Sequence, residues 1–131
     1  MSANEVPVNS LGTLLRGDNL FVAGFANGSV KIVSTAGSHQ LLCELSAHSR
    51  SLNALCCHPS RSVFATCSDD TFMHLFEVSG DKIDKIDVNL IISSRVNDYS
   101  LIGLAFSGDS NTTLLAAPYD YKSVLVWNNV V

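Results

Sequence analysis

The fold is decided by residues 63–78, VFATCSDDTFMHLFEV. Apolar side chains alternate with small or polar ones on each side of the Asp69-Asp70 pair, which is the pattern of two strands joined by a tight turn. Similar short runs continue along the chain between clusters of glycine, proline, asparagine and serine, and no window keeps the 3.6-residue period of a helix. The sequence therefore predicts an all-β fold.

This hairpin is part of an internal repeat. Residues 22–33, VAGFANGSVKIV, align with residues 65–76, ATCSDDTFMHLF, which lie 43 residues further along the chain. A third copy ends at Trp127, 51 residues after the end of the second. In the first copy, Asn27-Gly28 predicts a type I′ turn, because this turn needs a positive φ at both central residues. A period of roughly 40–45 residues with four strands per unit is typical of a β-propeller blade.

The second copy resembles the repeat unit of the WD-repeat family. Ala47-His48 stands at the position of the family's Gly-His pair, residues 64–70 match its second strand and turn, and residues 74–78 match its Leu-Trp-Asp end. The resemblance extends from about Val8 to Val131, and residues 19–78 also resemble the C-terminal part of one particular member. The departures from the family pattern are Val33 and Phe76 in place of Trp, Ser34 and Glu77 in place of Asp, and Ala47 in place of Gly.

On this pattern we expect WD-repeat β-propeller blades, about three blades less one strand, spanning approximately residues 8–46, 47–95 and 96–131. Closed propellers use at least four blades, so three blades predict a partial propeller. We expect the chain to be the C-terminal part of a larger propeller, or to pair with missing blades or with other copies. The expected strands are 9–15, 20–25, 30–33 and 40–45; 52–57, 63–67, 73–78 and 86–92; and 101–106, 114–117 and 124–127.

Composition narrows the class of protein. The chain has 131 residues, 47% of them apolar, and a formal charge of −4, which argues against nucleic-acid binding. Four cysteines contain no C-x-x-C pair, which favours free thiols in a reducing compartment. Residues 1–5 show no secretion-signal pattern and no apolar run has the length of a membrane-spanning helix, so we expect neither secretion nor membrane insertion. We expect an intracellular, cytoplasmic protein, and its mean hydropathy of +0.25 predicts apolar surface that something covers.

His48, Thr66 and Asp70 contain the groups of a catalytic relay. The family resemblance instead implies a structural network, in which these three side chains form a buried hydrogen-bond chain beneath the loops. A tryptophan is the usual fourth member, and Phe76 has no N–H to take that place. Cys56 and His58 share one face of a strand, but two ligands do not make a metal site. We expect no enzyme activity, no metal and no cofactor; a small β-sandwich enzyme is the remote alternative.

The resemblance implies a scaffold that binds other proteins through its loops. In this architecture two sets of loops share one face, and exposed aromatic residues and arginine dominate the energies of protein interfaces. The sequence does not identify the protein partner. The alternative is a self-assembling propeller fragment whose main contact completes a ring. The residues that we expect to contact a partner are Phe25, Arg50, Tyr119 and Tyr121.

Overall fold

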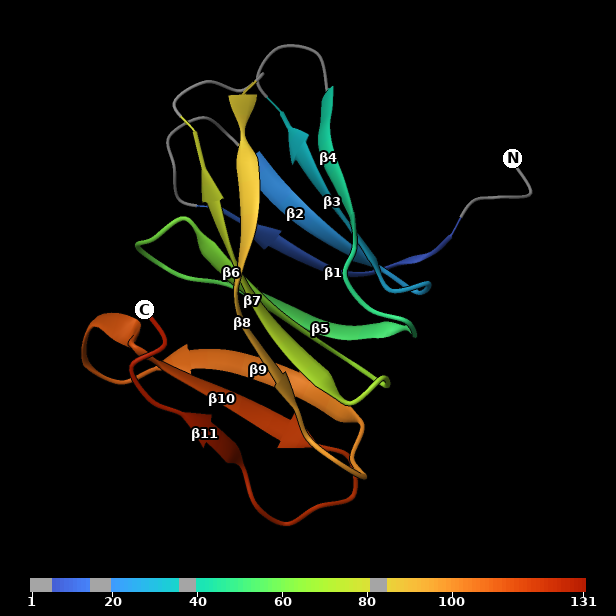
Figure 1. The fold of residues 1–131 in the computed structure, drawn as a ribbon, viewed down its shortest axis with the longest axis vertical. Coiled ribbons are helices and arrows are strands. Elements are labelled where there is room, and N and C mark those ends of the chain that lie inside the picture. The colour runs from blue at the N-terminus through green and yellow to red at the C-terminus, as the bar shows by residue number, and fades with distance from the viewer. Residues whose placement is uncertain (1–5, 15–19, 36–39, 81–84) are drawn as a thin grey trace.

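The computed structural model of the chain describes residues 6–14, 20–35, 40–80 and 85–131. Its strands form three antiparallel sheets that follow one another along the chain (Figure 1). A short 3-10 turn, η2 (Asp109–Asn111), lies between β9 and β10. The first sheet contains β1 (Val8–Thr13), β2 (Leu20–Phe25), β3 (Ser29–Ser34) and β4 (Gln40–Ser46); the second contains β5 (Leu52–Cys57), β6 (Val63–Ser68), β7 (Phe72–Ser79) and β8 (Asp87–Arg95); the third contains β9 (Leu101–Ser107), β10 (Thr113–Pro118) and β11 (Leu125–Trp127).

The alternating pattern predicted these strands, and the structure confirms the all-β fold class. Two of the predicted ranges, 20–25 and 52–57, coincide with β2 and β5. The largest difference is at β8, which continues to Arg95 because it pairs with β7 as far as Phe72. The first strand was expected to reach residue 15, which lies outside the described residues.

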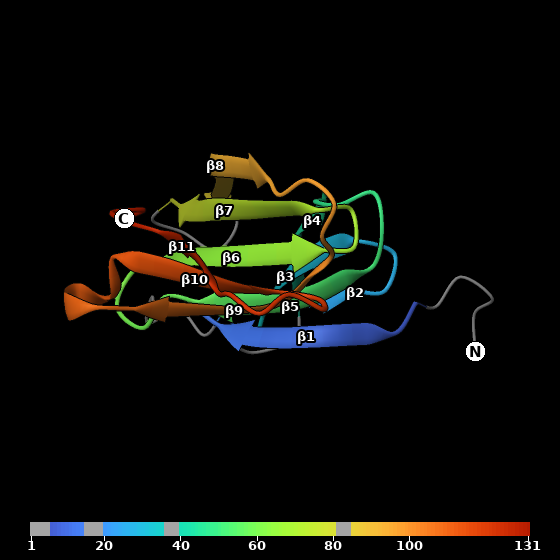
Figure 2. The same ribbon diagram turned by 90° about the horizontal axis from the view of Figure 1, so that it is seen from below.

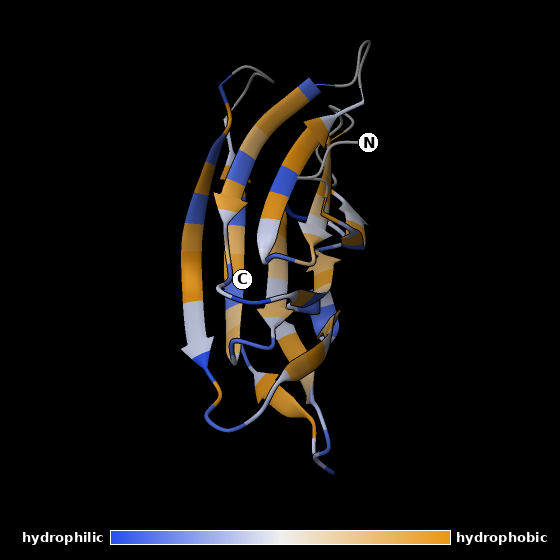
Figure 3. Cartoon of the chain, turned by 90° about the vertical axis from the view of Figure 1, so that its right-hand side faces the viewer, coloured by the Kyte–Doolittle hydropathy of each residue, from blue (hydrophilic) through white to orange (hydrophobic). Residues whose placement is uncertain are grey.

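The hydrophobic core lies between the sheets, in two separate clusters. One joins the first sheet to the second and contains Val22, Ile32, Leu52 and Phe64. The other joins the second sheet to the third through residues that include Leu114. Apolar residues accordingly concentrate along the strands of all three sheets in Figure 3. The second sheet is therefore packed on both of its faces.

The first strands of the sheets gather on one side of the molecule. In Figure 2, β1, β5 and β9 lie on the side opposite to β8, the last strand of the second sheet. Each of these three strands has a β-bulge near its start, where one residue has no partner in the neighbouring strand. The extra residues are Asn9, Asn53 and Ile102.

The first two bulges connect neighbouring sheets. The Nδ2 group of Asn9 donates a hydrogen bond to the Leu52 carbonyl at 2.6 Å, and the Nδ2 group of Asn53 donates one to the Leu101 carbonyl at 2.8 Å. Leu52 and Leu101 are the first residues of the next sheet in each case. The third bulge presents Ile102, which has no amide group to donate and is about half exposed.

The prediction of a type I′ turn at Asn27-Gly28 is wrong. The N–H of Gly28 donates to the Phe25 carbonyl at 3.0 Å, so Ala26 and Asn27 are the central residues, and only Gly28 has a positive φ, 87°. A type I turn followed by one left-handed residue forms a three-residue hairpin loop. The second sheet uses the same loop, with Thr71 at the left-handed position.

Within the described ranges, the structure contains no helix that is both long and apolar enough to cross a membrane.

Two features require glycine at position 28: its φ is positive, and neighbouring backbone atoms leave no room for a Cβ. A Cβ atom there would lie 2.2 Å from the His48 carbonyl oxygen and 2.5 Å from that of Arg50. We predict that Gly28→Ala lowers the free energy of unfolding by about 3 kcal/mol, because backbone atoms cannot move away cheaply and the positive φ is strained for alanine. Chemical denaturation measures this change.

Gly103→Ala is the matched control. Its Cβ would meet only the Cβ of Ala117, at 3.5 Å, and no positive φ occurs there. We expect a change within about 0.5 kcal/mol for this variant. Equal losses for the two substitutions would contradict the role assigned to Gly28.

Candidate functional site

Five connections meet at one end of the sheets, and we call them the rim: residues 25–29, 46–52, 68–72, 95–101 and 118–125. Backbone hydrogen bonds join each connection to another. The N–H of His48 donates to the Gly28 carbonyl at 3.0 Å, and that of Val96 donates to the Thr71 carbonyl at 2.8 Å. The N–H of Tyr119 donates to the Ser100 carbonyl at 2.8 Å. Backbone hydrogen bonds between neighbouring connections therefore hold the rim together, in addition to its side chains.

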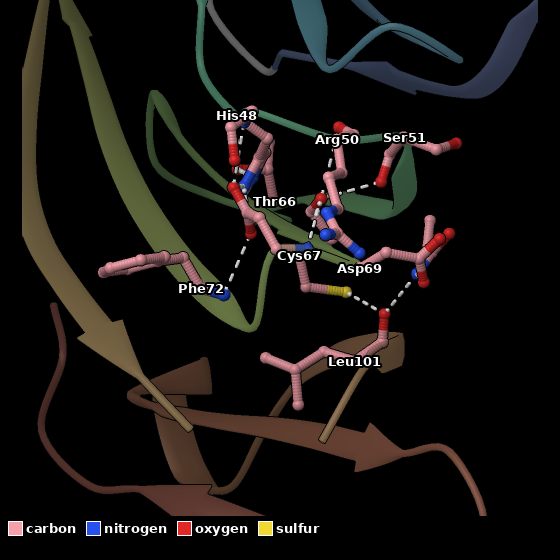
Figure 4. A network of polar contacts seen from close by, with 12 residues as sticks. His48, Arg50, Ser51, Thr66, Cys67, Asp69, Phe72 and Leu101 are labelled. Carbon is pink, nitrogen blue, oxygen red and sulfur yellow. Dashed lines mark hydrogen bonds and ion pairs between the residues drawn. The ribbon is translucent and has the colours of Figure 1, made fainter. Parts of the chain in front are cut away.

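The structure brings His48, Thr66 and Asp70 together beneath the rim (Figure 4). Nδ1 of His48 lies 3.0 and 3.1 Å from the two carboxylate oxygens of Asp70, and Nε2 lies 2.8 Å from the Thr66 hydroxyl. With the ring neutral, Nδ1–H donates to the carboxylate and Nε2 accepts from the hydroxyl. This chain connects the loop before β5 with β6 and with the turn that follows it.

Asp70 is the centre of this network. Its carboxylate also accepts hydrogen bonds from the backbone N–H groups of Phe72 at 3.0 Å and Ser49 at 3.1 Å. Burial raises the pKa of the carboxyl, but the donors of Phe72, His48 and Ser49 together outweigh it and hold the pKa below its usual value. Asp70 is therefore ionised at neutral pH and holds two connections of the rim together.

His48 and its neighbour His74 are both kept neutral. Burial lowers the pKa of His48 further than Asp70 raises it. The His74 ring lies 4.6 Å from that of His48. Burial lowers the pKa of His74 as well, and the repulsion that would arise if both rings were protonated lowers it further. Nδ1 of His74 is buried without a hydrogen-bond partner among the described residues. Two neutral imidazoles thus contact each other under the rim, with their ring planes tilted by 33°.

Sequence reasoning missed His74. The signal was available in the hairpin register, which pairs His74 with Thr66 and so places it on the same face as the network. At the position where the family has tryptophan, Phe76 packs on Phe64 with ring centroids 5.1 Å apart. Phe76 therefore supplies an aromatic ring at the tryptophan position, but it lacks the indole N–H that could donate a hydrogen bond to the network.

The network is closed to a substrate. Thr66 is fully buried and His48 is 7% exposed, so neither can act on a bound molecule in this structure. Both ring nitrogens of His58 are also engaged: Nδ1 accepts from the N–H groups of Ser60 and Arg61 at 3.0 Å, and Nε2 donates to the Asn111 carbonyl at 3.0 Å. His58 therefore closes a turn and has no nitrogen left for a metal. The part of the chain that the structure describes contains no group of three or more His, Cys, Asp or Glu side chains that could hold a metal ion.

The four residues expected to bind a partner lie on three connections of the rim, with Tyr119 and Tyr121 on the same one. Arg50 is exposed, and Tyr119 and Tyr121 are 65% and 47% exposed. Phe25 is half-buried, with the Lys31 ammonium 4.9 Å from its ring centroid. The structure therefore places all four on one end of the molecule, with Phe25 at the end of β2 in the first sheet and Tyr119 directly after β10 in the third.

Tyr99 is a rim residue that sequence reasoning missed. Its ring lies 4.7 Å from that of Tyr121, and the backbone bond from Tyr119 to Ser100 joins the two loops. All three tyrosines of the chain therefore gather at one corner of the rim, beside the third sheet. The pairing depends on two loops about twenty residues apart in the sequence, and no local pattern predicts it.

A family model and two curated relatives point to the same protein family. A family model described as WDR54 matches residues 3–130. Two curated relatives are WD repeat domain 54 from Rattus norvegicus, 25% identical over 112 residues, and WD repeat-containing protein 54 from Mus musculus, 24% identical over 112 residues. Each alignment covers 85% of this chain and 33% of the relative, so the chain spans about a third of the length of these relatives. WD repeat-containing protein 54 is the particular family member that residues 19–78 were found to resemble, and these two relatives confirm that resemblance.

A solved structure shows the same fold. The crystal structure of the Cps50 (Swd1) beta-propeller domain of Myceliophteria thermophila superposes with a TM-score of 0.81 at 17% sequence identity. The superposition covers 95% of this chain and 38% of that one. The three sheets are thus arranged as in a β-propeller.

Removing the network should destabilise the fold. We predict that His48→Ala or Asp70→Ala lowers the free energy of unfolding by about 2–4 kcal/mol, because each leaves buried polar groups without partners. Thermal unfolding followed by circular dichroism measures the loss. Glu44→Ala, which removes an exposed carboxylate on β4, should leave the midpoint nearly unchanged. An unchanged midpoint for Asp70→Ala would refute the structural role of the network.

Stability should fall with acidification. His48 and His74 have pKa values below the usual 6.5, so the unfolded chain takes up protons that the folded chain resists. Their contribution is complete above about pH 6.5 and declines at lower pH, by up to about 1.4 kcal/mol per pH unit for each group. Asp70, whose pKa is also lowered, adds a loss only below about pH 4.

Thermal midpoints measured between pH 8 and pH 5 test this expectation. His74→Phe should reduce the slope, because one of the two groups no longer titrates. A midpoint that is constant over this range, or a His74→Phe chain that keeps the full slope, would contradict it.

Proposed function

The chain belongs to the WDR54 family, and on this premise we propose that it is a non-enzymatic scaffold that binds other proteins through its rim. The observation that carries this proposal is the rim itself. It holds exposed aromatic and arginine side chains on loops that hydrogen bonds fix to a packed set of sheets. The loops lose little conformational freedom when a partner binds, because their backbone is already ordered.

Arg50 and the tyrosine corner are the parts of the rim that we assign to the partner. Arg50 follows the loop that Asp70 holds through His48 and Ser49, so its backbone is fixed from below. The carbonyl of Arg50 accepts from the Ser68 hydroxyl at 3.2 Å, which anchors it from a second side. The Tyr99–Tyr121 pair and Tyr119 offer large amphipathic surfaces of the type that is enriched at the centres of interfaces.

The cysteines fit an intracellular, cytoplasmic location, which is part of the proposal. All four are free thiols. Burial raises the pKa of Cys56, Cys57 and Cys67 to about 12, so they remain protonated and unreactive at neutral pH. They act as small apolar side chains within and between the sheets, for which no oxidising compartment is needed.

Affinity capture tests the scaffold function. The tagged chain is compared with an Arg50→Ala, Tyr119→Ala double variant in cell extract, and bound proteins are measured by quantitative mass spectrometry. We predict that at least one specific partner falls by tenfold or more, since two interface hot spots together contribute at least about 1.4 kcal/mol.

The control double variant is Arg61→Ala, Leu90→Ala. It removes an arginine from the turn at the opposite end of the second sheet and an exposed leucine from β8, so it should keep every partner. Both variants should melt as the unmodified chain does. An identical set of partners for the rim variant and the unmodified chain would rule out Arg50 and Tyr119 as binding residues.

A further inference from the structure

The tyrosine corner is built from two loops that repeat the same short pattern. The loop before β9 contains Asp98-Tyr99, and the loop after β10 contains Asp120-Tyr121. Both aspartates have a left-handed backbone, with φ values of 70° and 55°. The two tyrosine rings contact each other, with centroids 4.7 Å apart and planes tilted by 46°. The corner therefore presents a pair of aromatic rings, each next to an aspartate in the sequence.

The backbone does not require a negative charge at either aspartate. Glycine and asparagine adopt a left-handed conformation at least as readily, and asparagine has the same shape as aspartate. Both aspartates are exposed. Among the residues that the structure describes, neither carboxylate forms a hydrogen bond or an ion pair. The two negative charges are therefore available to another molecule.

Aromatic rings beside carboxylates favour a cation as the ligand. The face of a tyrosine ring carries partial negative charge and attracts an ammonium or guanidinium group within about 6 Å of its centroid. A neighbouring carboxylate adds charge-assisted hydrogen bonds. A guanidinium group is planar and has five N–H donors, so it can stack on a ring and donate to a carboxylate at the same time. Arginine therefore fits this chemistry better than lysine.

The rim already contains one contact between a cation and a ring. The Lys31 ammonium lies 4.9 Å from the Phe25 ring centroid in the first sheet. In the described part of the chain, no cation lies over a ring of the tyrosine corner. Tyr119 and Tyr121 are 65% and 47% exposed, so their rings can be reached from solvent. The chain thus supplies its own cation to Phe25 and leaves the tyrosines open to a cation from outside.

We propose that the tyrosine corner binds an arginine side chain of a protein partner, which stacks on Tyr121 and pairs with the carboxylates of Asp98 and Asp120. This inference rests on the proposed scaffold function, because it names the chemistry of the partner that the rim takes. Tyr99 is half-buried and holds the Tyr121 ring from its other side. A backbone hydrogen bond of 2.8 Å joins the two loops, so little order is lost when the partner binds.

The chain's own cations make this site selective for shape as well as charge. Lys122 directly follows Tyr121, and Arg95 lies three residues before Asp98. These two positive charges balance the two aspartates, so the corner has no net charge to attract basic proteins in general. Binding depends instead on a guanidinium group that meets a ring and a carboxylate together. A neutral side chain of the same shape should not bind.

Three short peptides test the proposal on the purified chain. Each consists of glycine and serine with one central residue, which is arginine, lysine or citrulline, and citrulline keeps the shape of arginine without its charge. NMR titration measures the affinity through the signals of the tyrosine rings. We expect the arginine peptide to bind at least tenfold more tightly than the citrulline peptide, with the lysine peptide between them.

Substitutions at exposed positions separate the contributions of the ring and the charges. Tyr121→Phe keeps an aromatic face and should keep the affinity for the arginine peptide, whereas Tyr121→Leu keeps only apolar volume and should lose at least tenfold. Asp98→Asn combined with Asp120→Asn keeps the backbone conformation, removes both charges and should lose a similar factor. Glu44→Gln, at an exposed carboxylate on β4, is the control and should bind as the unmodified chain does. Melting curves establish that each variant is folded.

Failure of the arginine peptide to bind, equal affinity for the arginine and citrulline peptides, or full affinity in folded Tyr121→Leu would overturn the proposal. The capture experiment with the Arg50→Ala, Tyr119→Ala variant distinguishes this failure from that of the scaffold function. A partner lost from that variant while the peptides show no preference would leave the scaffold standing without the arginine site. A preference for the arginine peptide with every partner retained would support the arginine site and remove the assigned rim residues.

Discussion

The rest of the structure depends on the burial of β6 from both sides. All six residues of this strand are buried, with Phe64 facing the first sheet and Ala65 facing the third. Burial of apolar surface is the main favourable contribution to folding, and a strand buried on both faces supplies it twice. The first and third sheets each obtain one packed face from this arrangement.

The polar network is a consequence of this packing. Thr66 lies within the fully buried strand, so its hydroxyl must find a partner inside the protein, and His48 provides it. The imidazole then needs an acceptor on its other side, which Asp70 supplies while also accepting from two backbone N–H groups of the rim. A polar residue in the core thereby fixes the loops at the surface, and the loops carry the proposed function.

The strands and the polar network could be predicted from the sequence, while several side-chain contacts and one turn type could not. Alternation of apolar residues located all the strands, because each side chain points to one face or the other in a period of two. The resemblance to WD repeats brought His48, Thr66 and Asp70 together. The ring contacts of His74 with His48 and of Tyr99 with Tyr121 were missed. The hairpin register places His74 on the face of Thr66, but only tertiary packing brings the His48 loop over it and brings the two tyrosine loops together. The turn at Gly28 was assigned the wrong type, because the hairpin closes through a three-residue loop in which Gly28 alone is left-handed. The second sheet forms the same loop without an Asn-Gly pair, so this pair does not decide the loop type.

The sequence by itself determined that this chain forms antiparallel sheets in a repeat, because alternation and turn residues act locally and recur at regular spacing. Tertiary structure decided which faces are covered. Equivalent positions such as Cys67 and Ala117 are similar in size and polarity, yet one is fully buried and the other lines an open depression. The difference comes from the neighbour that packs on each sheet, and a neighbour in space is a property of the assembled sheets that no stretch of sequence contains.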